Sequence, residues 1–138
     1  MPRDVEPHVH EVGVYYEDTD FSGVVYHANY LRYMERAREH LLGREELVRL
    51  YREGGVGFVV YKAALTYKEG AVFGDTLEVR TLGHTESAYR AVFEQRVHRK
   101  ADGKLLVDGE VHLVCVDRSN QLVPLPASVV DGMRARFG

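Results

Sequence analysis

Residues 29–41 read NYLRYMERAREHL, and this stretch decides the fold. Its apolar side chains recur at the i, i+3, i+4, i+7 and i+11 positions, which line one face of an α-helix. These residues are Tyr30, Tyr33, Met34, Ala37 and Leu41. Asn29 is predicted to cap the start of the helix and Gly43 to end it. On the polar side, Glu35 is spaced for i,i+3 ion pairs with Arg32 and Arg38.

The segments around this helix change to the two-residue period of β-strands. Residues 8–16 are predicted to form a first strand, after an irregular start at 1–7 that contains two prolines. A short helix over 45–52 follows the long one and ends at Gly54-Gly55. Four alternating segments come next, at 56–68, 75–83, 87–99 and 104–117, and then a terminal helix over 127–137.

Four consecutive strands joined by short turns predict an antiparallel meander. One sheet cannot bury a face alone, so we expect the long helix to pack across it. The predicted fold class is α+β, with one layer of helix on one layer of sheet, and the chain is expected to be a single domain over residues 1–138. The remaining face and the sheet edges favour dimerisation by edge pairing or face packing.

Composition excludes several classes of protein. The 138 residues carry 18 basic and 21 acidic side chains, for a net charge of −3, which argues against a general nucleic-acid binder. No run approaches the roughly 18 apolar residues of a membrane span, and no signal peptide is visible, so a cytoplasmic location is expected. The single cysteine, Cys115, cannot form an internal disulfide and is predicted to be a buried core thiol.

Residues 15–30, YYEDTDFSGVVYHANY, carry the candidate chemistry. Glu17, Asp18 and Asp20 crowd three carboxylates together, so mutual repulsion is expected to raise some of their pKa values. Gly23 permits a positive φ, and the following helix start offers free N–H groups for an oxyanion. A carboxylate beside such a site can attack a reactive ester as nucleophile or as general base. Alternatively, these acidic residues only cap the helix and stay solvated.

This segment, with the YMERAR run over 33–38, resembles the hotdog-fold acyl-CoA thioesterases. The resemblance is to the YbgC-like, Tol-Pal-associated branch, which is related to the 4-hydroxybenzoyl-CoA thioesterases. It implies a curved antiparallel sheet wrapped around one long central helix. It also implies homodimers or homotetramers, with the active site at the subunit interface near the helix N-terminus. No metal or other cofactor is implied, because CoA is part of the acyl-CoA substrate.

The resemblance places the catalytic Asp on Asp20 and the oxyanion-binding backbone N–H on His27. It gives the side chains of His27 and Tyr16 a catalytic or positioning role. The implied substrate-binding residues are Gly23, Val24, Val25 and Tyr26. Two departures from the family pattern are Phe21, in place of a small residue or Pro, and Gly70, where many relatives have Pro.

Alternatives remain open. A hotdog-fold hydratase or dehydratase is one, although the seven-residue spacing of Asp20 and His27 favours hydrolysis. A non-catalytic acyl-CoA-binding protein is another. His8 and His10 alternate on a strand as metal ligands can, but no third ligand is indicated. The candidates for phosphate contacts, by charge alone, are Arg90, Arg96, Arg99 and Lys100.

Overall fold

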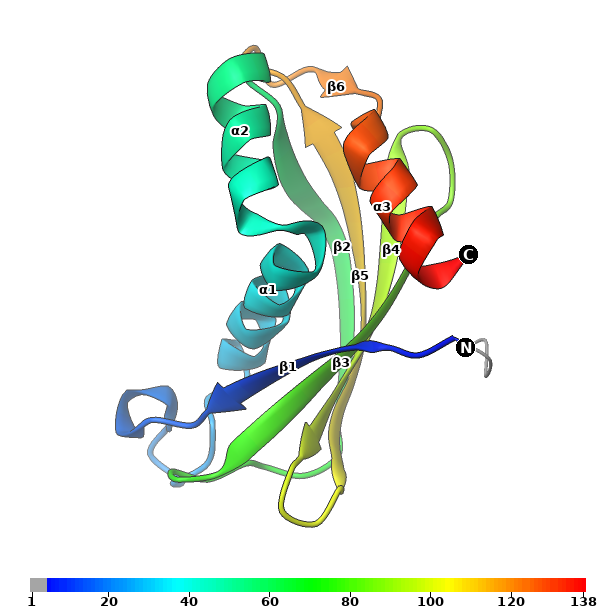
Figure 1. Cartoon of the computed structure of the whole chain (residues 1–138). Helices are drawn as coiled ribbons and strands as arrows, with labels where there is room; N and C mark the ends of the chain where they lie inside the picture. Colours follow the sequence, from blue (N-terminus) through cyan, green and yellow to red (C-terminus); the bar gives the residue numbers. More distant parts are fainter. Residues whose placement is uncertain (1–4) are drawn as a thin grey trace.

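The computed structural model describes residues 5–138, so the first four residues of the expected irregular start lie outside the described residues. Figure 1 shows a curved antiparallel sheet with helix α1 lying against one face. The helices are α1 (Asn29–Leu42), α2 (Arg44–Gly54) and α3 (Ala127–Phe137). The strands are β1 (His8–Gly13), β2 (Gly57–Tyr67), β3 (Thr76–Thr85), β4 (Arg90–Arg99), β5 (Leu105–Val116) and β6 (Leu122–Val123). A short 3₁₀ turn, η1 (Tyr16–Asp18), follows β1.

The strand order among the described residues is β1-β3-β4-β5-β2, with β6 beside β5. Strands β3, β4 and β5 form the expected meander, but the prediction that β2 continues it is wrong. Helices α1 and α2 carry the chain from β1 at one edge of the sheet to the opposite edge, where β2 pairs with β5. The α+β class is confirmed, and the curved sheet around α1 is the hotdog arrangement expected from the resemblance.

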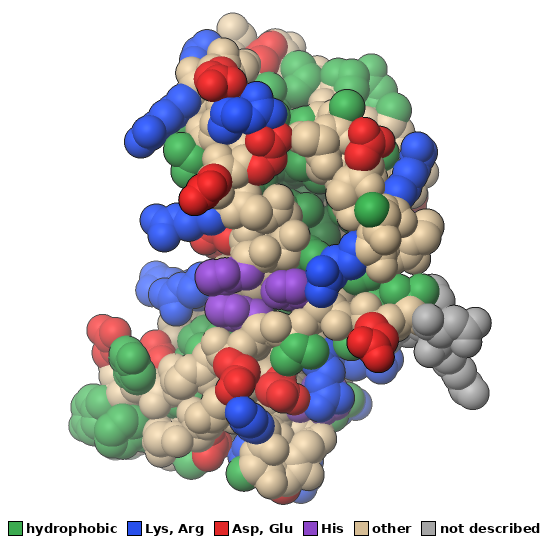
Figure 2. Space-filling model, in the orientation of Figure 1, with side chains coloured by type: hydrophobic (Ala, Val, Ile, Leu, Met, Phe, Trp, Pro, Cys, Tyr) green, Lys and Arg blue, Asp and Glu red, His purple; other side chains and the backbone are tan. Residues whose placement is uncertain are grey.

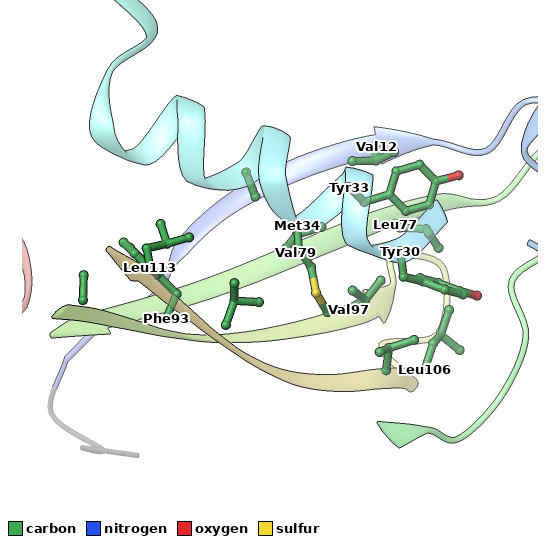
Figure 3. Close-up of a cluster of buried hydrophobic side chains, with 14 of the residues drawn as sticks. Val12, Tyr30, Tyr33, Met34, Leu77, Val79, Phe93, Val97, Leu106 and Leu113 are labelled. Carbon is green, nitrogen blue, oxygen red and sulfur yellow. The ribbon is translucent and has the colours of Figure 1, made fainter. Parts of the chain in front are cut away.

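The apolar stripe of α1 forms the centre of the core, as predicted. Tyr33, Met34 and Ala37 are at most 1% exposed, and Figure 3 shows Met34 among Val79 and Val97 of the sheet. The helix ends at Gly43, with φ of 93°, as expected. The capping prediction for Asn29 is wrong, because Ala28 occupies the N-cap and makes no side-chain cap bond. The Asn29 amide instead donates to Asp18 Oδ1 at 2.8 Å.

A polar network fastens α1 to the sheet. Arg38 is only 6% exposed, and its Nη1 donates to Gln95 Oε1 at 2.9 Å. Gln95, fully buried on β4, donates from Nε2 to the Met34 carbonyl and to Thr81 Oγ1, both at 3.0 Å. The predicted ion pairs of Glu35 are wrong, because no such pair forms within 4.0 Å in the part of the chain that the structure describes. Arg38 turns inward because Gln95 supplies an acceptor there.

Cys115 confirms its prediction as a core thiol. It is fully buried on β5, and burial raises its pKa to about 12, so it stays a neutral thiol. Within residues 5–138, no helix is long and apolar enough to cross a membrane.

Candidate active site

Asp20 opens a tight hairpin turn. Its N–H donates to the Val24 carbonyl at 2.8 Å, and the Gly23 N–H donates to the Asp20 carbonyl at 3.0 Å. Gly23 has φ of 85°, which confirms the positive φ expected there and suits glycine. A Thr19–Val25 bridge closes the turn. The sequence therefore folds locally so that Asp20 stands at the end of a short, well-defined hairpin.

The Asp20 carboxylate is only partly used by the protein. Its Oδ1 accepts the Ser22 N–H at 2.8 Å, which orients the side chain. Its Oδ2 receives no hydrogen bond from the described residues, and the residue is half-buried. One carboxylate oxygen is thus held in place, and the other has no hydrogen-bond partner in the described part of the chain.

The α1 N-terminus begins a few residues after this turn. The His27 carbonyl accepts the Tyr67 hydroxyl at 2.9 Å, and the Tyr26 carbonyl accepts the Asn29 N–H at 2.8 Å. The His27 N–H has no acceptor within the described part of the chain. Its exposed imidazole lies 4.4 Å from the Tyr26 ring and 6.3 Å from the Tyr67 ring, centroid to centroid. A free N–H at a helix start is a ready oxyanion donor.

Asp18 ties the turn to the helix. Its Oδ2 accepts the Tyr15 N–H and its Oδ1 accepts the Asn29 amide, both at 2.8 Å. Burial alone would raise the pKa of Asp18, but hydrogen bonds from Tyr15, Tyr33 and Asn29 outweigh burial and lower it. The pKa rise expected from crowded carboxylates therefore does not hold for Asp18. The alternative that these acidic residues only cap the following helix does not hold for Asp18 either, because it accepts the Asn29 side chain and, at the start of η1, the Tyr15 N–H, and α1 has no side-chain cap.

Replacing Asp18 with Asn tests this role through pH. Because the folded pKa lies below the unfolded value of about 3.9, the stabilisation is present above that pH and is lost as pH falls through the folded pKa. We expect Asp18→Asn to lower the free energy of unfolding by about 1–2 kcal/mol near pH 6. Urea denaturation across pH should show this difference shrinking below about pH 4. A difference that persists unchanged in acid would contradict the assignment.

The segment between β2 and β3 supports the turn from the other side. The Val25 N–H donates to the Ala71 carbonyl at 2.9 Å, and Val24 bridges to Val72. Arg99 holds this segment, with its guanidinium 3.2 Å from Asp75 Oδ2 and 3.3 Å from the Gly70 carbonyl. The turn that carries Asp20 thus rests on a clamped loop.

Gly70 approaches the turn closely. A Cβ added there would lie 2.8 Å from Val24 Cγ1, closer than packed atoms tolerate. We expect Gly70→Ala to push the Asp20 turn aside, at a cost of about 1–3 kcal/mol in the free energy of unfolding and with a loss of activity. Gly57→Ala is the matched control, because its Cβ would meet nothing within 4 Å. Equal melting temperatures for the two variants would refute the contact.

Basic residues considered for phosphate contacts have acidic partners. Arg99 pairs with Asp75, Asp102 and Glu69, and Lys100 pairs with Glu11. Arg96 pairs with Asp108, and Arg90 with Glu86. These contacts favour structural roles for all four.

The remaining candidate residues are spread around the turn. Tyr16 is 77% exposed and packs edge-on against Phe73, at 5.9 Å between ring centroids. No hydrogen bond joins its hydroxyl to Asp20 or His27 among residues 5–138. The Val25 side chain is buried in the core, so it is not available to contact a substrate. The Tyr26 side chain is half-exposed. Phe21 is fully exposed at the tip.

Sequence reasoning missed Tyr67. Its hydroxyl reaches the His27 carbonyl from β2, 40 positions away along the chain. A strand tyrosine carries no local signal of such a contact, so no pattern in the sequence points to it.

Comparisons with known proteins give a consistent result. Residues 14–134 match the family model described as the thioesterase-like superfamily. The acyl-CoA thioester hydrolase YbgC of Escherichia coli is 43% identical over 108 residues, which are 77% of this chain and 79% of the relative. The acyl-CoA thioesterase YbgC of Haemophilus influenzae is 40% identical over 77% of this chain and 78% of its own length.

Solved structures agree. Slr0204, a 1,4-dihydroxy-2-naphthoyl-CoA thioesterase from Synechocystis, superposes with a TM-score of 0.85 at 26% identity. The match covers 92% of this chain and 95% of that one. A probable thioesterase from Bartonella henselae gives a TM-score of 0.81 at 30% identity, over 87% of this chain and 99% of that one.

Proposed function

The chain belongs to the thioesterase-like superfamily and is a thioester hydrolase, and from this premise we propose that it cleaves acyl-CoA thioesters to a free acid and CoA. One observation supports the location of the proposed active site. The hairpin turn holds Asp20 with one free carboxylate oxygen, a few residues before the unpaired His27 N–H at the start of α1. These are the two groups that ester attack requires.

In the proposed reaction, the thioester carbonyl oxygen accepts the His27 N–H. Charge develops on that oxygen as the tetrahedral species forms, and the positive end of the α1 dipole stabilises it. Asp20 either attacks the carbonyl carbon, forming an anhydride that water then opens, or takes a proton from the attacking water. In both routes the C–S bond breaks, water supplies the new oxygen, and CoA leaves as a thiolate that gains a proton.

His27 acts in this proposal through its backbone. We expect His27→Ala to lower kcat/KM by less than about tenfold, because the N–H and the helix start survive the substitution. Steady-state kinetics with an accepted acyl-CoA checks this. A loss of about a hundredfold or more would instead assign the chemistry to the imidazole.

We further propose that a second copy of the chain completes the site, as a homodimer or homotetramer. Strand β2 lies at a sheet edge among the described residues, and its central side chains are exposed. Exposed aromatic rings also surround the turn, namely Tyr16, Phe21, Tyr26 and Phe73. An interface between two copies commonly pairs exposed strand edges and buries exposed aromatic side chains.

The proposed function is tested with a panel of acyl-CoA thioesters. Short aliphatic, aromatic and long-chain acyl groups are each incubated with the wild-type protein, and release of the CoA thiol is followed with a thiol reagent. We expect catalysed release from at least one class, which also defines the acyl group. Binding of acyl-CoA without thiol release across the panel would refute hydrolysis.

A further inference from the structure

Three histidines, two from β1 and one from α1, gather where these two elements meet. The rings of His10 and His40 stack, with centroids 4.4 Å apart and planes inclined by 22°. His8 stands two residues before His10 on β1, and alternate residues of a strand share a face. Figure 2 shows the histidine side chains side by side in the middle of the face in view, with Lys or Arg side chains next to them.

The surroundings of these histidines are cationic. Arg136 of α3 and the other two histidines act electrostatically on His8, while His40 and Arg36 of α1 act on His10. Burial first, and these positive neighbours second, lower the pKa of both His8 and His10. None of the five side chains has a carboxylate within 4.0 Å in the described part of the chain.

His8 also has a buried ring nitrogen that lacks a hydrogen-bond partner in the described part of the chain. Its Nδ1 is enclosed and is the one buried side-chain nitrogen or oxygen without a hydrogen-bond partner among residues 5–138. A metal ion does not explain the cluster, because the same residues contain no group of three or more His, Cys, Asp or Glu placed to hold one. The unpartnered Nδ1 and the cationic neighbours favour an anion as the ligand of this cluster.

A groove lined largely by apolar residues is connected to the cluster through Arg136. It has a volume of about 340 Å³ and lies between α1 and α3. Leu41 and Leu42 line it from α1, directly after His40, and Val129 and Met133 line it from α3. Arg136 belongs to both features, because it lines the groove and also acts on His8. The groove therefore combines apolar side chains from both helices with a cationic residue, Arg136.

We propose that the groove and the histidine cluster together bind an anionic amphiphile, a carboxylate with an apolar tail. The tail fills the groove between α1 and α3, and the carboxylate lies against His8, His10, His40 and Arg136. This site is separate from the proposed thioesterase site, because neither Asp20 nor His27 lines the groove. Its occupation does not require that the chain hydrolyse a thioester.

The site predicts a dependence on pH. An anion stabilises protonated histidines, so binding is tightest when the histidines are charged and weakens as pH rises through their pKa values. For His8 and His10 those values lie below 6.5 in the free protein, and no neighbouring carboxylate opposes the shift. A fatty carboxylate stays ionised above about pH 5. A change in binding affinity between about pH 6 and pH 8 therefore reports on titration of the protein and not of the ligand.

Isothermal titration calorimetry of the full chain tests the proposal with three probes. Decanoate supplies head and tail, 1-decanol supplies the tail alone, and inorganic phosphate supplies an anion alone. We expect decanoate to bind about tenfold or more tighter than either partial probe, and tighter near pH 6 than near pH 8. Equal affinity for decanol, or for phosphate, would overturn the amphiphile assignment.

Variants separate the two halves of the site. Gly132 lines the groove, and a Cβ added there meets nothing within 4 Å, so Gly132→Leu is chosen to add an apolar side chain to the groove lining. We expect it to abolish decanoate binding, and His10→Gln with His40→Gln to weaken binding about tenfold and flatten its pH dependence. Arg90→Gln, an exposed arginine that does not line the groove, is the control and should bind normally. Unchanged binding by Gly132→Leu would refute the site, and melting temperatures confirm that each variant is folded.

Discussion

Replacing Asp20 with Asn is expected to lower kcat/KM for acyl-CoA hydrolysis by about 10²–10⁴-fold. The amide keeps an oxygen that accepts the Ser22 N–H, so the hairpin turn and the melting temperature should be preserved. An amide is neither a competent nucleophile nor a base at neutral pH, so the loss should fall on kcat rather than on substrate affinity. Thiol release, measured over a range of concentrations of the best substrate of the panel, gives both kcat and KM.

Glu17→Gln is the matched control for this experiment. Glu17 lies in η1, is exposed and belongs to the same acidic segment, but the proposed mechanism gives it no role. Its activity should stay within about twofold of the wild type, as expected for a surface change. Turnover by Asp20→Asn at the wild-type rate would show that another group performs the attack.

The largest expected loss of stability follows from removing Gln95. Gln95→Leu leaves the Arg38 guanidinium without its acceptor and the Met34 carbonyl and Thr81 hydroxyl without their donor, all in the core. Buried polar groups that lose partners cost about 1–3 kcal/mol each, so we expect about 3 kcal/mol or more in the free energy of unfolding. Urea denaturation monitored by circular dichroism measures it.

A second substitution separates burial from hydrogen bonding. Arg38→Met combined with Gln95→Leu removes the stranded charge together with its partner, and such paired replacements are often neutral or stabilising. The double variant should therefore regain a large part of the lost stability. If the losses in the free energy of unfolding from Arg38→Met and Gln95→Leu simply add in the double variant, the contact between the two side chains contributes nothing. The cost would then arise from packing alone.

Much of the fold could be predicted because its determinants are local. The stripe of α1 follows from spacing within four turns, and Gly43 marks its end because a positive φ suits glycine. Two-residue alternation located β3, β4 and β5. The motif over 15–30 correctly indicated a tight turn at Gly23 followed by a helix start.

The features that escaped prediction depend on distant partners. Alternation indicates which face of a strand is buried but not which strand lies beside it, so β2 was expected next to β3. Arg38 appeared to be a surface residue because its acceptor, Gln95, lies 57 positions away. Asn29 has the chemistry of a cap, yet a carboxylate 11 positions earlier binds its amide. The roles proposed for Asp20, His27 and Tyr16 come from the family resemblance, because their residue types alone do not specify a reaction.

The position of β2 has a consequence for synthesis of the chain. Gly57 pairs with Val116 and Val12 pairs with Leu77, so both edge strands close against partners made about 60 residues later. A ribosome-bound chain therefore holds α1 and β2 without a completed sheet until nearly the whole sequence has emerged. Contacts so distant in sequence slow folding and leave apolar surface open in the interim. We expect nascent chains truncated before β5 to be protease-sensitive and to depend on chaperones, whereas chains that include β5 become protected in one step.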